Sequence, residues 1–168
     1  QFWGPYMCGK STLTGHIVAN MQKNDLGVYG GTAAVFDSEG KFNTKWWSEW
    51  GVDLTRVIVP EFRFGEEAYY QMRKLIGKVD IIILDSVATL LSKEEVTRED
   101  DKQRIGANSR MNTAELALIV TGTYKRTKST GAVTEDISTP LKKSKTVFIL
   151  INQIRANIGV MFGPTEKR

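Results

Sequence analysis

The sequence predicts an α/β fold, in which a mainly parallel, twisted sheet is flanked by helices. Short apolar runs of strand length alternate along the chain with segments of helical periodicity, which is typical of such folds. The run at 79–84 is almost wholly apolar and β-branched, as expected of a central strand that is covered on both faces. With 168 residues, of which 41% are hydrophobic, the chain is long enough to bury about one core.

The expected elements follow in order along the chain. A helix is predicted over 11–21, because Leu13, Ile17 and Met21 recur every fourth residue and therefore lie on one face. The further expectations are strands at 32–37 and 57–59, a helix at 66–76, the central strand at 79–84, a helix at 111–120 and a buried strand at 146–151. Two polar stretches, 92–104 and 123–145, interrupt this alternation.

The composition excludes several classes of protein. Its 25% charged and 10% aromatic residues are ordinary for a globular chain and rule out a disordered or collagen-like one. No stretch approaches the 18 apolar residues of a membrane span and no signal peptide opens the chain, so we expect a cytoplasmic protein without a membrane partner. The single cysteine, Cys8, excludes a disulfide framework. Because the first residue is Gln1 and not Met, we expect a piece of a longer protein.

The basic character of the chain is concentrated in the segment 123–145. The whole chain has 23 basic and 19 acidic residues and a formal charge of +4. The segment alone has six bases against two acids, so the rest of the chain is neutral. Two interpretations stay open, a solvated surface hairpin and a surface that contacts a polyanion.

A phosphate-binding motif, G-x-x-x-x-G-K-[ST], occupies residues 4–11. Its glycines let successive backbone N–H groups surround an anion, and a helix that begins near Ser11 presents its positive end to the same place. Lys10 can reach the β- and γ-phosphates and is a catalytic candidate, while the Ser11 hydroxyl can ligate Mg²⁺. The predicted phosphate-binding residues are Gly4, Pro5, Tyr6, Met7, Cys8, Gly9, Lys10, Ser11 and Thr12.

Acidic residues that follow two apolar strands, at 85 and at 37–39, complete the predicted site. Asp85 follows the apolar run 81–84, at the edge where open parallel sheets bind ligands, and would hold Mg²⁺ together with Ser11. Asp37 and Glu39 follow another apolar run, 33–36, and should emerge at the same edge. Glu39 lies further into the loop, so it is the better candidate to orient or deprotonate an attacking water.

These motifs together resemble the RecA family of recombinases. The segment 151–164, INQIRANIGVMFGP, is similar to the start of the family's second DNA-binding loop. The segments 79–88, 37–39 and 51–53 resemble its Walker B strand, its catalytic-glutamate motif and a short motif that follows. The resemblance implies a P-loop NTPase fold with a RecA-like ATPase core. Residues 1–168 would be part of that core, without its N-terminal element and C-terminal part, and 123–145 would be a basic insertion within it.

The resemblance also implies roles for individual residues. Glu39 would activate the water and Gln153 would sense the γ-phosphate. Trp46 would stack on adenine, although an indole at this position is equally compatible with the face of a helix in the core. The first DNA loop would lie at 97–105. The implied DNA-binding residues are Lys102, Arg104, Arg110, Arg155, Ile158, Gly159 and Phe162.

The function implied by the resemblance is that of an ATP-dependent DNA recombinase. Such a protein would use ATP and Mg²⁺, bind single-stranded DNA, pair it with homologous duplex DNA and promote strand exchange in recombination and repair. It would assemble into an open helical filament and hydrolyse ATP in a DNA-dependent manner, although this chain alone is expected to be inactive. The alternatives are a RecA-like ring ATPase or helicase, and a non-catalytic RecA-like nucleotide-binding paralogue.

Three departures from the family's pattern suggest a divergent member, either of phage type or otherwise distant from the typical bacterial proteins. The first DNA loop reads REDDKQR, with acids where the family has glycines. The insertion at 123–145 is longer than the usual connection, and Ala117 stands where the family has an arginine.

Overall fold

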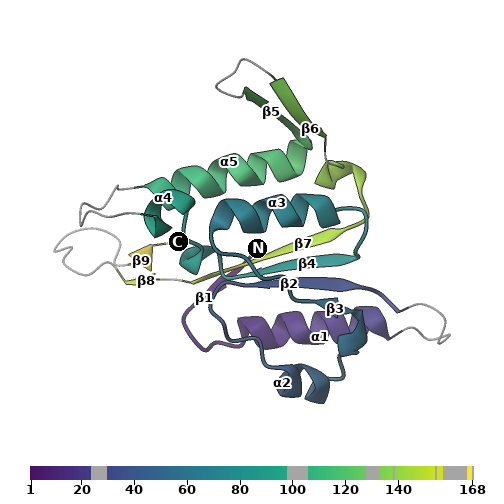
Figure 1. Ribbon diagram of the computed structural model, residues 1–168. Coiled ribbons are helices and arrows are strands. Elements are labelled where there is room, and N and C mark those ends of the chain that lie inside the picture. The colour runs from purple at the N-terminus through teal and green to yellow at the C-terminus, as the bar shows by residue number, and fades with distance from the viewer. Residues whose placement is uncertain are drawn as a thin grey trace.

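The computed structural model describes residues 1–23, 30–97, 106–127, 133–137, 139–153, 155–156 and 166–167 (Figure 1). Its centre is a five-stranded sheet of order β1-β7-β4-β2-β3, in which every pairing is parallel. The strands are β1 (Phe2–Gly4), β2 (Ala33–Asp37), β3 (Val57–Ile58), β4 (Ile81–Asp85) and β7 (Val147–Gln153). The predicted α/β class with a parallel sheet is therefore confirmed.

Helices cover both faces of the sheet. One face carries α1 (Lys10–Gln22) and α2 (Thr44–Glu49), and the other carries α3 (Gly65–Leu75), α4 (Lys93–Val96) and α5 (Ala107–Thr121) (Figure 1). Short 3₁₀ turns lie at Leu54–Arg56, Val87–Thr89 and Leu141–Lys143. Among the described helices, none combines the length and the apolarity that a membrane crossing requires.

Two small antiparallel pairs stand outside the central sheet. The strands β5 (Thr123–Thr127) and β6 (Val133–Ile137) form a hairpin that projects beyond the end of α5 (Figure 1). Part of the basic segment 123–145 is therefore a hairpin. Whether this segment is only a solvated hairpin or also contacts a polyanion stays open. The second pair is β8 (Arg155–Ala156) with β9 (Glu166–Lys167).

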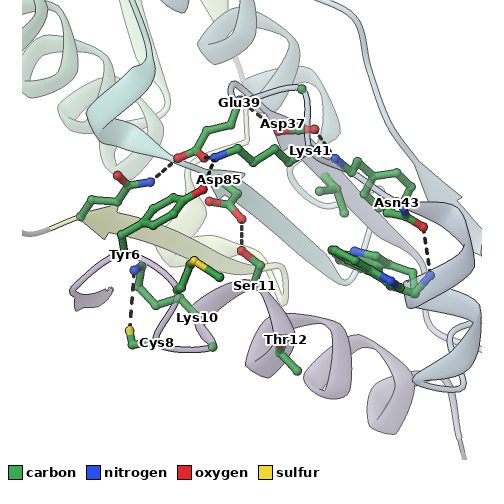
Figure 2. A pocket seen from close by; sticks show the side chains of 18 of the residues that line it. Tyr6, Cys8, Lys10, Ser11, Thr12, Asp37, Glu39, Lys41, Asn43 and Asp85 are labelled. Atoms are coloured by element: carbon green, nitrogen blue, oxygen red, sulfur yellow. Dashed lines mark hydrogen bonds and ion pairs between the residues drawn. The ribbon is translucent and has the colours of Figure 1, made fainter.

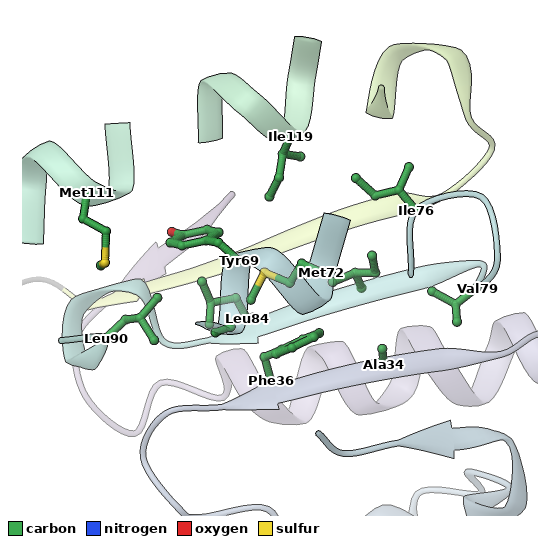
Figure 3. Packing of buried hydrophobic residues seen from close by; sticks show 12 residues of the cluster. Ala34, Phe36, Tyr69, Met72, Ile76, Val79, Leu84, Leu90, Met111 and Ile119 are labelled. Carbon is green, nitrogen blue, oxygen red and sulfur yellow. The ribbon is translucent and has the colours of Figure 1, made fainter. Parts of the chain in front are cut away.

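The hydrophobic core consists of two clusters, one on each face of the sheet. Figure 3 shows the cluster under α3 and α5, where Tyr69 and Met72 of α3 pack with Phe36 and Leu84 of the strands. The opposite cluster joins the other side chains of β4, such as Ile83, to α1 and α2. The central strand is thus buried on both faces, as its continuous apolar sequence predicts.

The helix predicted over 11–21 exists as α1, but the predicted apolar residues Leu13, Ile17 and Met21 are not its most buried ones. Val18 and Ala19 are fully buried, whereas Leu13 is half exposed. Gly15 explains the difference, because a Cβ atom at this position would lie only 2.3 Å from Cε3 of Trp50. Trp50 therefore packs closely over Gly15, while Ile17 and Met21 lie partly buried at the margin of the core.

Candidate active site

A cavity of about 610 Å³ opens at the edge of the sheet where the parallel strands end. The strand register brings the predicted residues there, because Asp37 is paired with Asp85 and Gly4 with Gln153. The predicted residues that line the cavity are Tyr6, Met7, Cys8, Gly9, Lys10, Ser11, Thr12, Glu39, Trp46, Asp85 and Gln153. Figure 2 shows how the phosphate loop, the loop after β2 and the end of β4 face one another.

The phosphate loop connects β1 to α1 through unusual backbone conformations. Gly9, at the N-cap of α1, has φ 86°, and Met7 has φ 61°. Gly9 has no side chain that could accept a hydrogen bond, so no N-cap side chain occupies the first N–H groups of α1. Such a helix start favours an anion, and the loop therefore fits a phosphate group.

Lys10 folds back onto this loop. Its Nζ donates to the carbonyl oxygens of Gly4 (3.1 Å) and Pro5 (2.7 Å) and lies 3.7 Å from Sγ of Cys8. Gly4 and Pro5 thus support Lys10 and do not themselves line the cavity. Gly4 also has a packing role, because a Cβ there would lie 2.9 Å from Sγ of Cys8.

Ser11 and Asp85 form the pair that was predicted to bind a metal. The Ser11 hydroxyl donates to Oδ2 of Asp85 at 2.5 Å. Burial raises the pKa of Asp85, and the nearby charges of Glu39 and Asp37 raise it further, against the lowering effects of Ser11 and Lys10. Crowded carboxylates of this kind favour a cation, and hydroxyl and carboxylate oxygens are ligands that suit Mg²⁺.

The described part of the chain contains no group of three or more His, Cys, Asp or Glu side chains able to form a metal cage. This donor set fits Mg²⁺, which usually binds proteins through one or two side chains and completes its shell with water and phosphate. The arrangement therefore suits a metal that arrives together with a phosphate ligand.

Glu39 is held by three donors. Gln153 Nε2 and Ser86 Oγ (3.1 Å) both donate to Oε1. Lys41 Nζ lies 2.5 Å from Oε2 (Figure 2). Burial alone would raise the pKa of Glu39, but these hydrogen bonds outweigh it and leave the pKa below its ordinary value. Glu39 is therefore ionised at neutral pH and able to accept a proton from water.

Asp37 has a different task from Glu39. Its two carboxylate oxygens accept hydrogen bonds from the backbone N–H groups of Glu39 (3.0 Å) and Phe42 (2.6 Å). It thereby closes the loop that carries Glu39. Asp37 and Glu39 both line the cavity, and the choice of Glu39 as the acid that acts on water stays a prediction, with which the engaged Asp37 carboxylate is compatible.

The tryptophans of the segment 46–50 divide into two groups. Trp46, Trp47 and Trp50 all line the cavity, but Trp46 is 56% exposed, whereas Trp47 is 5% exposed and also belongs to the core. The helix is started by Asn43, whose side chain accepts from the N–H of Trp46 at 3.1 Å. Trp46 therefore has a face available for a planar ligand, while Trp50 packs against α1.

Most of the predicted DNA-binding residues lie outside the described residues. Arg110 is exposed on α5, beside Ser109 and Thr113. Arg155 is placed only as backbone, in β8. The residues outside the description are Lys102, Arg104, Ile158, Gly159 and Phe162.

Sequence reasoning missed two contributors to the site, Lys41 and Ser86. Ser86 directly follows Asp85 and is fully buried, and a buried serine gives no pattern of its own. Lys41 follows Glu39 by two residues, and a charged residue in a loop is normally a solvated one. The glycine between them, Gly40, is the feature that would have indicated a tight turn.

Comparison with known proteins agrees with this geometry. The family model for the RecA N-terminal domain matches residues 1–168. The chain is 36% identical to Protein RecA of Rhodopirellula baltica over 168 residues, which cover 99% of this chain and 39% of that relative. It is 34% identical to Protein RecA of Chlorobaculum tepidum and of Herpetosiphon aurantiacus, again over 99% of this chain, and covers 42% and 40% of them. The chain thus spans about two fifths of the length of these curated relatives.

Proposed function

The chain belongs to the RecA N-terminal domain family, and from this membership we propose that it is the ATPase core of a DNA recombinase. The protein would bind single-stranded DNA, pair it with homologous duplex DNA and promote strand exchange, as a helical filament in the cytoplasm. ATP hydrolysis would depend on DNA. The observation that carries the enzymatic part of this proposal is the Glu39 carboxylate, which is held by Lys41 and Gln153 and lines the same cavity as the Ser11–Asp85 pair.

The residues of the cavity suit phosphoryl transfer to water. Bound ATP and Mg²⁺ would supply the phosphate that is transferred and the cation that neutralises its charge. The loop at 6–12 would bind the phosphates through its N–H groups and through Lys10, once that side chain turns from the carbonyls of Gly4 and Pro5. Ser11 and Asp85 would hold the metal. Glu39 would orient the water and accept its proton at a carboxylate oxygen.

Gln153 would connect this reaction to DNA. It is the last residue of β7 and donates a hydrogen bond to Oε1 of Glu39. The chain continues from it directly into 154–162, where the second group of DNA-binding residues is predicted. A movement of Glu39 on nucleotide binding would therefore act directly on Gln153, the residue just before this segment. This contact supports a coupling between ATP and DNA.

The variant Glu39→Gln tests the catalytic assignment. We expect it to lower the rate of DNA-dependent ATP hydrolysis by about 10²- to 10⁴-fold, because the amide cannot take up the proton. The measurement belongs in the longest natural form of the protein that contains this sequence. Glu49→Gln, on the exposed side of α2, is the matched control and should leave the rate unchanged. If Glu39→Gln hydrolyses ATP at the original rate, the assignment is wrong.

The basic segment has its own test. Lys142, Lys143 and Lys145 are exposed just before β7 begins, whereas the cavity lies where the parallel strands end. If they contact phosphates, replacing all three by Gln should reduce the slope of log affinity for single-stranded DNA against log salt by about 2. An unchanged slope would favour the interpretation of this segment as a surface hairpin.

A further inference from the structure

Lys41 joins the loop after β2 to the phosphate loop. Its Nζ lies 2.5 Å from Oε2 of Glu39 and donates to the Tyr6 hydroxyl at 3.2 Å, and it lies 4.8 Å from the centre of the Tyr6 ring (Figure 2). The Lys41 side chain is 57% exposed, whereas that of Glu39 is 11% exposed. The ammonium therefore keeps contact with water while it binds a carboxylate that is largely enclosed.

The loop is built so that Lys41 turns back towards Glu39. Gly40 stands between them with φ 65°, a conformation that glycine adopts without strain. A Cβ at Gly40 would meet nothing within 4 Å, so the backbone conformation and not the available space requires glycine here. The hydrogen bonds from Glu39 N and Phe42 N to the Asp37 carboxylate close the same turn on the other side. The position of Lys41 is thus fixed by the loop around it.

The three donors divide the Glu39 carboxylate between them. Ser86 and Gln153 both use Oε1, and Lys41 uses Oε2. An ionised carboxylate offers about four lone-pair positions, so about one remains, on Oε2, for a further donor. Lys41 therefore decides how the oxygen with the remaining position is oriented.

We propose that Lys41 is a positioning residue for hydrolysis, which holds the Glu39 carboxylate by Oε2 and ties it to Tyr6 of the phosphate loop. The proposal rests on the function proposed above. It assigns Lys41 no contact with the reacting atoms, and its effect passes through Glu39. The charge suits the role, because the hydrogen bonds with Glu39 and Tyr6 raise the pKa of Lys41 and keep the ammonium protonated.

The test compares Lys41→Met, Lys41→Arg and Lys45→Met in DNA-dependent ATP hydrolysis by the longest natural form of the protein. We expect Lys41→Met to lower kcat about 10-fold or more with KM for ATP changed less than about twofold, because only the geometry of the general base is lost. Lys41→Arg should restore most of the rate, since a guanidinium also donates to a carboxylate. Lys45 is exposed on α2 outside the cavity, so Lys45→Met removes the same charge without effect.

Several outcomes would overturn the proposal. They are a Lys41→Met variant with unchanged kcat, one in which KM alone changes, and a Lys41→Arg variant as slow as Lys41→Met. ATP binding by each variant, followed by fluorescence titration, shows whether the site is folded. If Glu39→Gln abolishes hydrolysis and Lys41→Met does not affect it, only the role of Lys41 is wrong. If Glu39→Gln is also without effect, the proposed catalytic function falls too.

Discussion

The buried ion pair between α3 and α5 offers a direct test of how these helices are held together. Arg73 Nη1 donates to Oε2 of Glu115, and their side chains are 7% and 15% exposed. Within the described part of the chain, Nε of Arg73 is buried without a hydrogen-bond partner. Glu115 is thus the main partner of a guanidinium that is almost completely enclosed. The perturbation we consider is Glu115→Ala.

The expected cost is about 3 kcal/mol of unfolding free energy. Breaking a buried pair by removing one partner costs about 3–5 kcal/mol, because the remaining charge is left without compensation. The lower end applies here, since water can reach Arg73 through the partly exposed site of Glu115. Both charges are largely enclosed, so the cost of their desolvation offsets much of the attraction within the pair. Replacing both residues, as Arg73→Met with Glu115→Leu, should therefore stay within about 1 kcal/mol of the original protein.

Urea unfolding of the full chain, followed by its tryptophan fluorescence, to which the buried Trp47 contributes, measures these differences. The matched control is Glu67→Ala. It breaks the Arg63–Glu67 pair, which is more exposed with an N–O distance of 3.5 Å, and should cost less than about 1 kcal/mol. A cost of Glu115→Ala no larger than that of this control would show that Glu115 does not compensate a buried charge. So would a double replacement that costs as much as Glu115→Ala alone.

Further outcomes follow from the packing and the cavity. Gly15→Ala should destabilise the chain by about 1–3 kcal/mol in urea unfolding, because its methyl group meets Trp50, whereas helix propensity alone would predict a gain. Trp46→Ala should raise the Kd for ATP about tenfold in a binding titration without changing stability, while Trp47→Ala should cost about 3–5 kcal/mol of unfolding free energy.

The fold could be predicted where burial leaves a pattern in the sequence. β4 is covered on both faces, so its residues form a continuous apolar run, which is typical of a central strand in a parallel sheet. The buried face of α1 could not be predicted, because it depends on the contact between Gly15 and Trp50, the residue that ends α2. The short helix α4 (Lys93–Val96) has one turn, too few residues for a period, and is started by Ser92, whose hydroxyl accepts from Glu95 N at 3.3 Å.

The candidate site could be predicted as far as it depends on strand ends. Asp85 and Glu39 each follow an apolar strand, and parallel strands end at the same edge, so their proximity follows from the topology. The support around Glu39 could not be predicted in this way. Whether Lys41 reaches Glu39 depends on the backbone conformation of Gly40, and whether Ser86 does depends on the turn after β4. These are side-chain directions within loops, on which hydrophobic periodicity carries no information.

The two ion pairs Lys41–Glu39 and Arg73–Glu115 show that burial decides what a charge pair does. The exposed ammonium of Lys41 loses little hydration, so its pair adds little to stability, but it fixes the direction of one carboxylate oxygen. The enclosed Arg73 has lost its water, so its pair is needed for stability and lies away from the cavity. Replacing Lys41 and replacing Glu115 should therefore change different quantities. Lys41→Met should slow hydrolysis and leave the urea midpoint unchanged, whereas Glu115→Ala should lower the midpoint and leave kcat of the folded protein unchanged. A variant of either residue that changed both quantities together would contradict this division.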